Sequence, residues 1–194
     1  MLLSSTPIQP MRQLLHSLYA LASAERYLFT PEDLRGLLPE LSDGAFKTLL
    51  SRADRSGLLR RVCRGLYVFE PAAPRDGLLL FHAAARLRAN HFNYISLETA
   101  LSDAGAISQV PISWLTVMSS ARSSRIDCGR WGTLEFVHTR QQPADVAEHL
   151  QYDARCRLWR ATTQLALRDM RATRRSMDLV APDRMDGSST DEPV

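Results

Sequence analysis

The chain has 194 residues, of which 45% are hydrophobic and 23% are charged, and its formal net charge is +3. This composition is typical of a soluble globular protein with one sizeable domain or two small ones, and it excludes a chain that is disordered throughout. The three cysteines are widely spaced and form no CxxC pair, which argues against a disulfide framework and a zinc site and favours a reducing compartment.

The N-terminal residues predict an amphipathic helix. Residues 21–24 resemble a signal-peptidase site, but polar side chains interrupt the apolar stretch before them and Arg12 is the single early cation, which argues against a secretory leader. No apolar run approaches the length that a membrane-spanning helix needs. We therefore expect a cytoplasmic protein without a membrane partner. The residues that would pack this first helix under the rest of the domain are Met11, Leu14, Leu15, Leu18 and Leu21.

Two short helices are predicted next. The first begins after Thr30, a good capping residue, has Pro31 at its first helical position, and is ended by Pro39. The second begins after Ser42 and stops at Gly57, a residue that favours a helix C-terminus. Its apolar residues recur at helical spacing and form a buried face, which consists of Phe46, Leu49, Leu50 and Ala53.

A hairpin follows the helices. Residues 58–62 and 66–69 have the composition of β-strands, and Arg64 with Gly65 suits a tight turn because glycine tolerates positive φ. Two helices followed by a hairpin predict a winged helix-turn-helix, a DNA-binding module, over residues 1–70. The hairpin is the wing of this module.

The exposed positions of this region are basic. From Ser42 to Phe69, six cations stand against the two acids Asp43 and Asp54, and this balance suits a polyanionic partner. In the functional interpretation, the second helix enters the major groove of double-stranded DNA and the wing contacts phosphates. The alternative is a solvated helix face on a winged helix that contacts only proteins. The predicted DNA-binding residues are Lys47, Thr48, Ser51, Arg52 and Arg55 on the helix and Arg60, Arg61 and Arg64 on the wing.

Pro71 and Pro74, which lie among small residues, mark the expected domain boundary. The following domain, residues 75–177, combines helices and strands. The predicted fold class is therefore α+β, with an N-terminal winged helix-turn-helix followed by a mixed α+β domain. The expected elements are helices over 76–89, over 96–101 with Ser96 as its cap, from Pro143 and over 154–175, and strands over 114–118 and 131–139.

The last predicted helix, 154–175, is rich in arginine. Its cations outnumber its acids, so it is either a surface for nucleic acid or an acidic protein, or an ordinary solvated helix face. Its arginines are Arg155, Arg157, Arg160, Arg168, Arg171, Arg174 and Arg175. Residues 178–194 hold five acids, one arginine and few apolar residues, which predicts a disordered acidic tail that would screen the basic helix.

The sequence contains no recognised catalytic motif. The residues from which an active site would have to be built are His82, His91, Glu98, Asp103, Asp127, Glu135, His138 and His149. Asp127 with Glu135 suggests a metal-dependent nuclease, but such sites usually have a nearby lysine, and the one lysine of the chain is Lys47. Glu135 and His138 also point to opposite faces of a strand. We therefore expect no enzyme, no cofactor and no metal site.

Several segments resemble a known family. They are residues 93–101 (NYISLETAL), 105–111 (GAISQVP), 115–118 (LTVM) and 131–138 (WGTLEFVH), together with Gly65-Leu66-Tyr67 in the wing. In this order, over about residues 30–139, they resemble the AbiEi antitoxin family of type IV toxin–antitoxin systems. The resemblance implies a transcriptional autorepressor that binds inverted repeats upstream of its own operon. It also implies that the second domain neutralises a nucleotidyltransferase-like AbiEii toxin without forming a stable complex.

Three functions remain as hypotheses. The first is a DNA-binding repressor that acts as a type IV antitoxin. The second is a solitary winged-helix transcriptional regulator without a toxin partner, and a metal-dependent nuclease is a distant third. A homodimer is expected in the first two cases, because two half-sites one or two helical turns apart give an affinity that one small winged helix seldom reaches.

Overall fold

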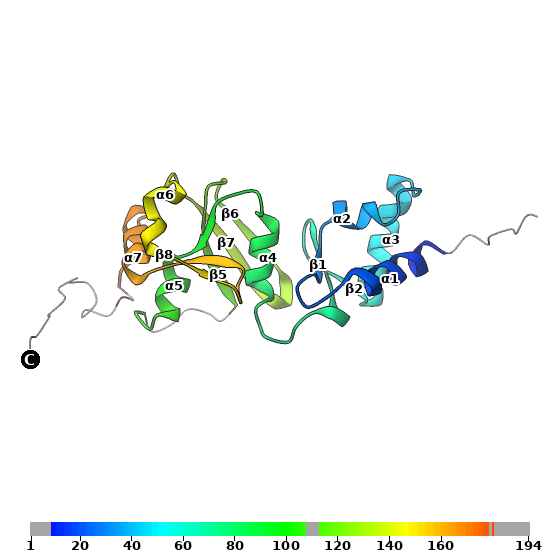
Figure 1. Ribbon diagram of the computed structural model, residues 1–194, viewed down its shortest axis with the longest axis horizontal. Coiled ribbons are helices and arrows are strands. Elements are labelled where there is room, and N and C mark those ends of the chain that lie inside the picture. The colour runs from blue at the N-terminus through cyan, green and yellow to red at the C-terminus, as the bar shows by residue number, and fades with distance from the viewer. Residues whose placement is uncertain (1–8, 108–112, 179, 181–194) are drawn as a thin grey trace, which may run out of the picture. The chain divides into compact units, whose positions relative to one another are not determined.

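The computed structural model describes residues 9–107, 113–178 and 180 (Figure 1). The chain divides into two compact units, Met1–Leu79 and Leu80–Val194. The expected acidic tail at 178–194 lies outside the described residues except for Asp178 and Val180. Residues 108–111 of the GAISQVP segment also lie outside them. No helix in the described ranges is long and apolar enough to cross a membrane.

The first unit has the element order of a winged helix. Its elements are α1 (Pro10–Leu21), β1 (Leu28–Phe29), α2 (Pro31–Gly36), α3 (Asp43–Ser56), β2 (Leu59–Cys63) and β3 (Leu66–Phe69). β3 pairs antiparallel with both β1 and β2, so the sheet order is β1-β3-β2. The predicted helix-turn-helix and wing are therefore confirmed, with the first wing strand shifted by one residue.

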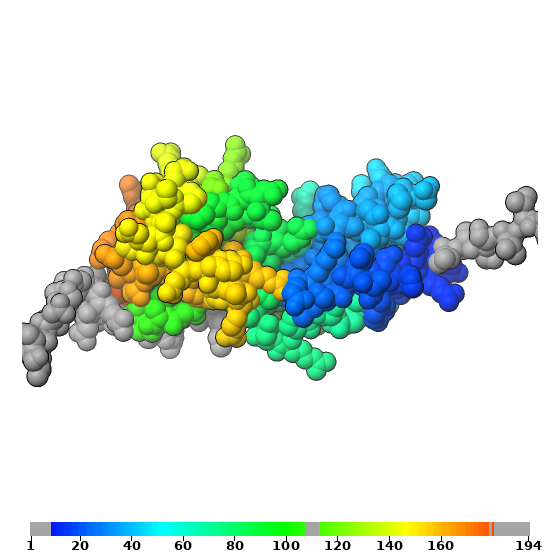
Figure 2. All heavy atoms as spheres, in the orientation of Figure 1, coloured from blue at the N-terminus to red at the C-terminus, as the bar shows by residue number. Residues whose placement is uncertain are grey.

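The core of the first unit joins α1 to α3. Leu14 and Leu18 of α1 are fully buried and belong to one apolar cluster with Phe46 and Leu50 of α3 and Phe69 of β3. In Figure 2 the blue spheres of α1 lie directly against the lighter blue spheres of α2 and α3. The amphipathic first helix predicted from the sequence is thus confirmed, except that Leu21, which was expected to pack, is exposed, and α1 supports α3 from behind.

The second unit is built on a mixed six-stranded sheet. Its helices are α4 (Leu79–Leu87), α5 (Leu97–Asp103), α6 (Pro143–Val146) and α7 (Thr163–Ala172), and its strands are β4 (Asn93–Ile95), β5 (Trp114–Ser119), β6 (Ser124–Asp127), β7 (Thr133–His138), β8 (Leu150–Asp153) and β9 (Leu158–Ala161). The strand order is β6-β7-β5-β4-β9-β8, with parallel pairing in β5–β7 and β4–β9. The predicted α+β class is confirmed.

Helices cover both faces of this sheet. Phe136 of β7 lies under the guanidinium of Arg88, which directly follows α4, whereas Thr116 of β5 hydrogen-bonds to Thr99 of α5. Phe136 of β7 is paired with Val117 of β5, so both side chains lie on the same face of the sheet. Thr116 lies on the opposite face, because side chains alternate along a strand. α4 therefore covers one face, and α5, which packs against α7, covers the other (Figure 1).

The predicted long helix over 154–175 is wrong. Residues 150–161 form the β8–β9 hairpin, and β9 also pairs in parallel with β4. A helix begins only at Thr163, with Thr162 as its N-cap residue. Smaller shifts also occur, because α4 is shorter than the predicted 76–89 and β7 begins at Thr133, two residues after Trp131.

Candidate nucleic-acid interface

Local sequence signals fix both ends of α3. The Ser42 side chain accepts a hydrogen bond from the backbone N–H of Ala45, and Gly57 ends the helix with a positive φ of 78°. The predicted inward face is confirmed, since Phe46, Leu49, Leu50 and Ala53 are buried. The opposite face of α3 is therefore presented to solvent.

All eight predicted DNA-binding side chains lie on exposed positions of the first unit. Five lie on α3, two on β2 and one in the turn of the wing; they are Lys47, Thr48, Ser51, Arg52, Arg55, Arg60, Arg61 and Arg64. Gly65 follows Arg64 with a φ of +85°, a left-handed conformation that side chains with a Cβ rarely adopt. The turn thus holds Arg64 at the exposed tip of the wing.

Some of these side chains have partners within the protein. The Arg55 guanidinium donates to the Ser51 hydroxyl at 3.0 Å, and the Thr48 hydroxyl donates to the carbonyl of Gly44 at 2.9 Å. Arg60 forms an ion pair with Glu70 at 3.1 Å. Within the described part of the chain, no side-chain hydrogen bond or ion pair is found for Lys47, Arg52 or Arg64.

Asp54 connects α3 to the wing. Its carboxylate accepts a hydrogen bond at 2.9 Å from the backbone N–H of Arg61 on β2, an edge strand of the sheet. The Arg61 side chain turns back along the same strand and donates to the carbonyl of Cys63 at 3.2 Å. The negative charge of Asp54 disfavours binding of a polyanion, but its hydrogen bond orients the basic helix and the basic wing relative to each other. Sequence reasoning missed this role, because no spacing rule links a helix acid to a strand amide seven residues later.

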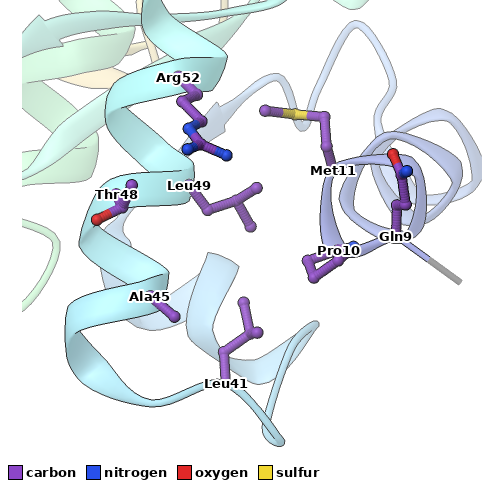
Figure 3. A pocket seen from close by; sticks show the side chains of 8 residues that line it. All are labelled: Gln9, Pro10, Met11, Leu41, Ala45, Thr48, Leu49 and Arg52. Carbon is purple, nitrogen blue, oxygen red and sulfur yellow. The ribbon is translucent and has the colours of Figure 1, made fainter. Parts of the chain in front are cut away.

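A groove beside α3 was also missed. It has a volume of about 450 Å³ and lies between the start of α1 and the exposed side of α3 (Figure 3). Two predicted DNA-binding residues, Thr48 and Arg52, line it. Its other lining residues are Gln9, Pro10, Met11, Leu41, Ala45 and Leu49.

Asp127 and Glu135 of the second unit are not arranged as a nuclease pair. The strand register places Asp127 opposite Thr133 and Glu135 opposite Arg125. Burial raises the pKa of Glu135, but hydrogen bonding and the charge of Arg175, 2.9 Å away, outweigh it, so the pKa is lowered overall. Among the described residues, no group of three or more histidines, cysteines and acids lies close enough together to hold a metal ion.

The arginines predicted to line one helix are dispersed over the second unit. Arg160 on β9 pairs with Asp153 at 3.0 Å and also with Asp103. Burial alone would raise the pKa of Asp153, but hydrogen bonds from Cys156 and Arg160 lower it to about 2. Arg175 bridges two glutamates, with a distance of 2.9 Å to each. Arg160 and Arg175 therefore form ion pairs within the second unit.

Ser96 has a different role from the predicted one. It occupies the N-cap position of α5, but its side chain makes no capping hydrogen bond. Its hydroxyl instead donates to the carboxylate of Asp169 on α7 at 2.7 Å, and both residues are fully buried. The next residue, Leu97, has a φ of +57°. The Ser96 segment of the resemblance therefore joins α5 to α7 inside the second unit.

Residues 16–69 match a family described as transcriptional regulators, AbiEi antitoxin. Over these residues the chain is similar to AbiEi transcriptional regulators. The matched range contains the helix-turn-helix, the wing and all eight predicted DNA-binding residues. The quoted segments after residue 69 lie outside the match.

One solved structure supports the fold of a larger part of the chain. The crystal structure of the RV2827C protein from Mycobacterium tuberculosis is similar over 78% of this chain, with 19% sequence identity and a TM-score of 0.50. The similarity covers 53% of that protein, so this chain spans about half its length. No curated protein matches the chain. At this level of identity, the similarity to RV2827C shows the fold alone.

Proposed function

We propose that the protein is a transcriptional repressor that binds inverted repeats upstream of its own operon and acts as a type IV antitoxin in the cytoplasm. In this proposal, residues 1–70 bind DNA and residues 75–177 counteract a nucleotidyltransferase-like toxin. The observation that carries the proposal is the exposed basic face of α3 and the wing within residues that match a family of antitoxin regulators.

The geometry of the first unit supports this assignment. α3 is anchored by a buried apolar face, and its outward side chains include a lysine and two arginines. Arginine forms bidentate hydrogen bonds to guanine and phosphate, so these side chains suit both base reading and backbone contacts. In this proposal Arg64 at the wing tip contacts a phosphate, because wing residues flank the helix that enters the groove. Each phosphate contact adds about 0.9 to the slope of log affinity against log salt concentration.

Sequence-selective binding is the decisive experiment. The intact protein is titrated against fluorescent DNA from upstream of its own gene and against a shuffled duplex of equal length, at two salt concentrations. A variant with Arg52, Arg55 and Arg64 changed to alanine should lose more than about 100-fold in affinity, because three contacts of at least 1 kcal/mol each are removed.

A matched control separates a specific surface from net charge. Arg122, Arg140 and Arg171 are exposed arginines of the second unit, and changing all three to alanine removes the same charge. This control variant should keep its selectivity and its salt slope. Equal losses in both variants, or no preference of the intact protein for its upstream DNA, would refute the repressor assignment.

The antitoxin part of the proposal needs a separate test. Co-expression with a toxin encoded beside the gene should restore growth, and the rescue should require residues after 74. The competing candidate is a solitary regulator, and it is favoured by the restriction of the family match to residues 16–69. Selective DNA binding without any rescue would establish that candidate. Analytical ultracentrifugation with and without operator DNA tests the expected homodimer.

A further inference from the structure

The groove between α1 and α3 has the composition of a small-molecule site. At about 450 Å³ it falls within the size range of ligand pockets. Pro10 and Met11 form the α1 side, and Leu41, Ala45 and Leu49 form the α2–α3 side (Figure 3). A mostly apolar wall with a few placed polar groups is the usual lining of such sites.

Arg52 is the one charged residue of the lining. Figure 3 shows its side chain extending from α3 toward α1, beside Leu49 and across from Met11. A guanidinium is a planar donor that matches a carboxylate through two parallel hydrogen bonds. The groove therefore offers an apolar channel with a carboxylate-binding group at its edge.

We propose that this groove binds a medium-chain fatty acid, with the hydrocarbon chain against Met11, Leu41 and Leu49 and the carboxylate on Arg52. Charge complementarity favours this occupant, because a carboxylate gains a bidentate pair with the Arg52 guanidinium that a neutral chain cannot form, whereas the guanidinium would repel a cationic chain. The groove volume of about 450 Å³ can accommodate a hydrocarbon chain of about eight carbons.

Such a ligand would oppose operator binding. Arg52 and Thr48 line the groove and are also predicted DNA contacts, so a bound carboxylate neutralises one cation of the DNA-binding surface. The salt slope of operator binding should fall by about 0.9 when the ligand is present. This regulatory consequence rests on the proposed DNA-binding function, whereas the binding of the fatty acid itself does not.

Ligand binding is tested first without DNA. Sodium octanoate is titrated into full-length protein carrying ¹³C-methyl methionine, and the Met11 signal is identified by its loss in the Met11→Leu variant. Octanoate should shift the Met11 signal in a saturable way, while 1-octanol and octyltrimethylammonium at equal concentration should bind at least 10-fold more weakly. Absence of saturable binding at millimolar octanoate, or equal binding of octanol, would overturn the proposal.

Variants then locate the site. Arg52→Met removes the charge and keeps the length of the side chain, and it should weaken octanoate binding at least 10-fold. Arg12→Met is the matched control, because Arg12 is an exposed arginine of α1 that does not line the groove. Ala45→Phe fills the groove from an exposed position and should abolish binding. Unchanged binding in both Arg52→Met and Ala45→Phe, with all variants melting like the parent, would place octanoate elsewhere and overturn the assignment.

The operator experiment completes the test. Octanoate should release the intact protein from its upstream DNA and should leave the Ala45→Phe complex unaffected. Octanoate binding without any selective DNA binding would refute the proposed repressor function and leave the ligand site standing. A Met11 shift that depends on protein concentration and not on octanoate would assign the groove to a second copy of the chain and overturn the fatty-acid proposal.

Discussion

Replacing Asp169 by alanine should destabilise the second unit by about 2–4 kcal/mol. Asp169 is fully buried and accepts hydrogen bonds from the Ser96 hydroxyl at 2.7 Å and from the Gln141 side-chain amide at 2.8 Å. Each buried donor that loses its partner costs about 1–3 kcal/mol. The expected total is below the maximum, because removing the carboxylate also removes the cost of burying its charge.

Asparagine at the same position separates hydrogen bonding from charge. Its oxygen accepts from Gln141, and its amide group donates to the Ser96 hydroxyl, so Asp169→Asn should change stability by less than about 1 kcal/mol at neutral pH. Burial raises the pKa of Asp169 above the unfolded value of 3.8, despite hydrogen bonds that act in the opposite direction. The folded protein therefore binds this proton more readily than the unfolded chain. The parent should gain stability relative to Asp169→Asn as pH falls through the folded pKa, and the gain should level off below 3.8.

Tryptophan fluorescence during urea unfolding measures both effects. All three tryptophans, Trp114, Trp131 and Trp159, lie in the second unit, so the signal reports that unit alone. The reasoning would be refuted by an Asp169→Asn variant as unstable as Asp169→Ala. It would also be refuted by a stability difference between parent and Asp169→Asn that does not change with pH.

Substitutions at four further positions test the backbone at three glycines and the hydrogen bond between α3 and the wing. Gly65→Ala should lower the free energy of unfolding by about 1–2 kcal/mol, because it puts a Cβ at a φ of +85°. Gly44→Ala in α3, where the new methyl has open space, should be neutral or stabilising by up to about 1 kcal/mol. Circular dichroism melting of both variants measures this contrast, and equal effects would contradict it. Gly132→Ala should cost about 3 kcal/mol or more in the fluorescence assay, because its Cβ would lie 2.1 Å from the carbonyl oxygen of Ser113. Asp54→Ala should lower stability by about 1 kcal/mol relative to Asp54→Asn, because asparagine keeps the acceptor for the wing amide; equal melting temperatures would show that this hydrogen bond does not hold the wing.

The first unit was predictable because its signals are local. Ser42 and Gly57 mark the two ends of α3 within the residues that they cap. The inward face follows from helical spacing, and the tight turn of the wing follows from Gly65. Each feature depends on neighbours a few residues away, so the sequence is sufficient to place the eight basic and hydroxyl side chains on the solvent-facing side. Their contact with DNA stays a prediction.

The second unit was only partly predictable because its contacts are distant in sequence. The hairpin over 150–161 has no glycine in its turn, and Arg157 adopts the positive φ there with a value of 58°. Its strand β9 is fixed by parallel pairing with β4, about 65 residues earlier in the chain. The helical spacing of apolar residues after 154 was therefore misleading, since no short-range pattern shows which strand a segment will pair with.

The winged helix and the character of its exposed face follow from the sequence alone, because caps, turns and periodicity act over a few residues. Tertiary structure decided the partners of Arg160 and Arg175, the burial of Asp169 beside Ser96, and the groove in which Met11 faces Arg52. Apart from the pair of Arg160 with Asp153, which lie seven residues apart, each of these arrangements brings together side chains that are tens of residues apart. Such pairs form because the burial of apolar surface packs distant helices and strands against one another. A charged group or hydrogen-bond donor that becomes buried in this packing needs a partner, and the neighbouring helix or strand supplies it.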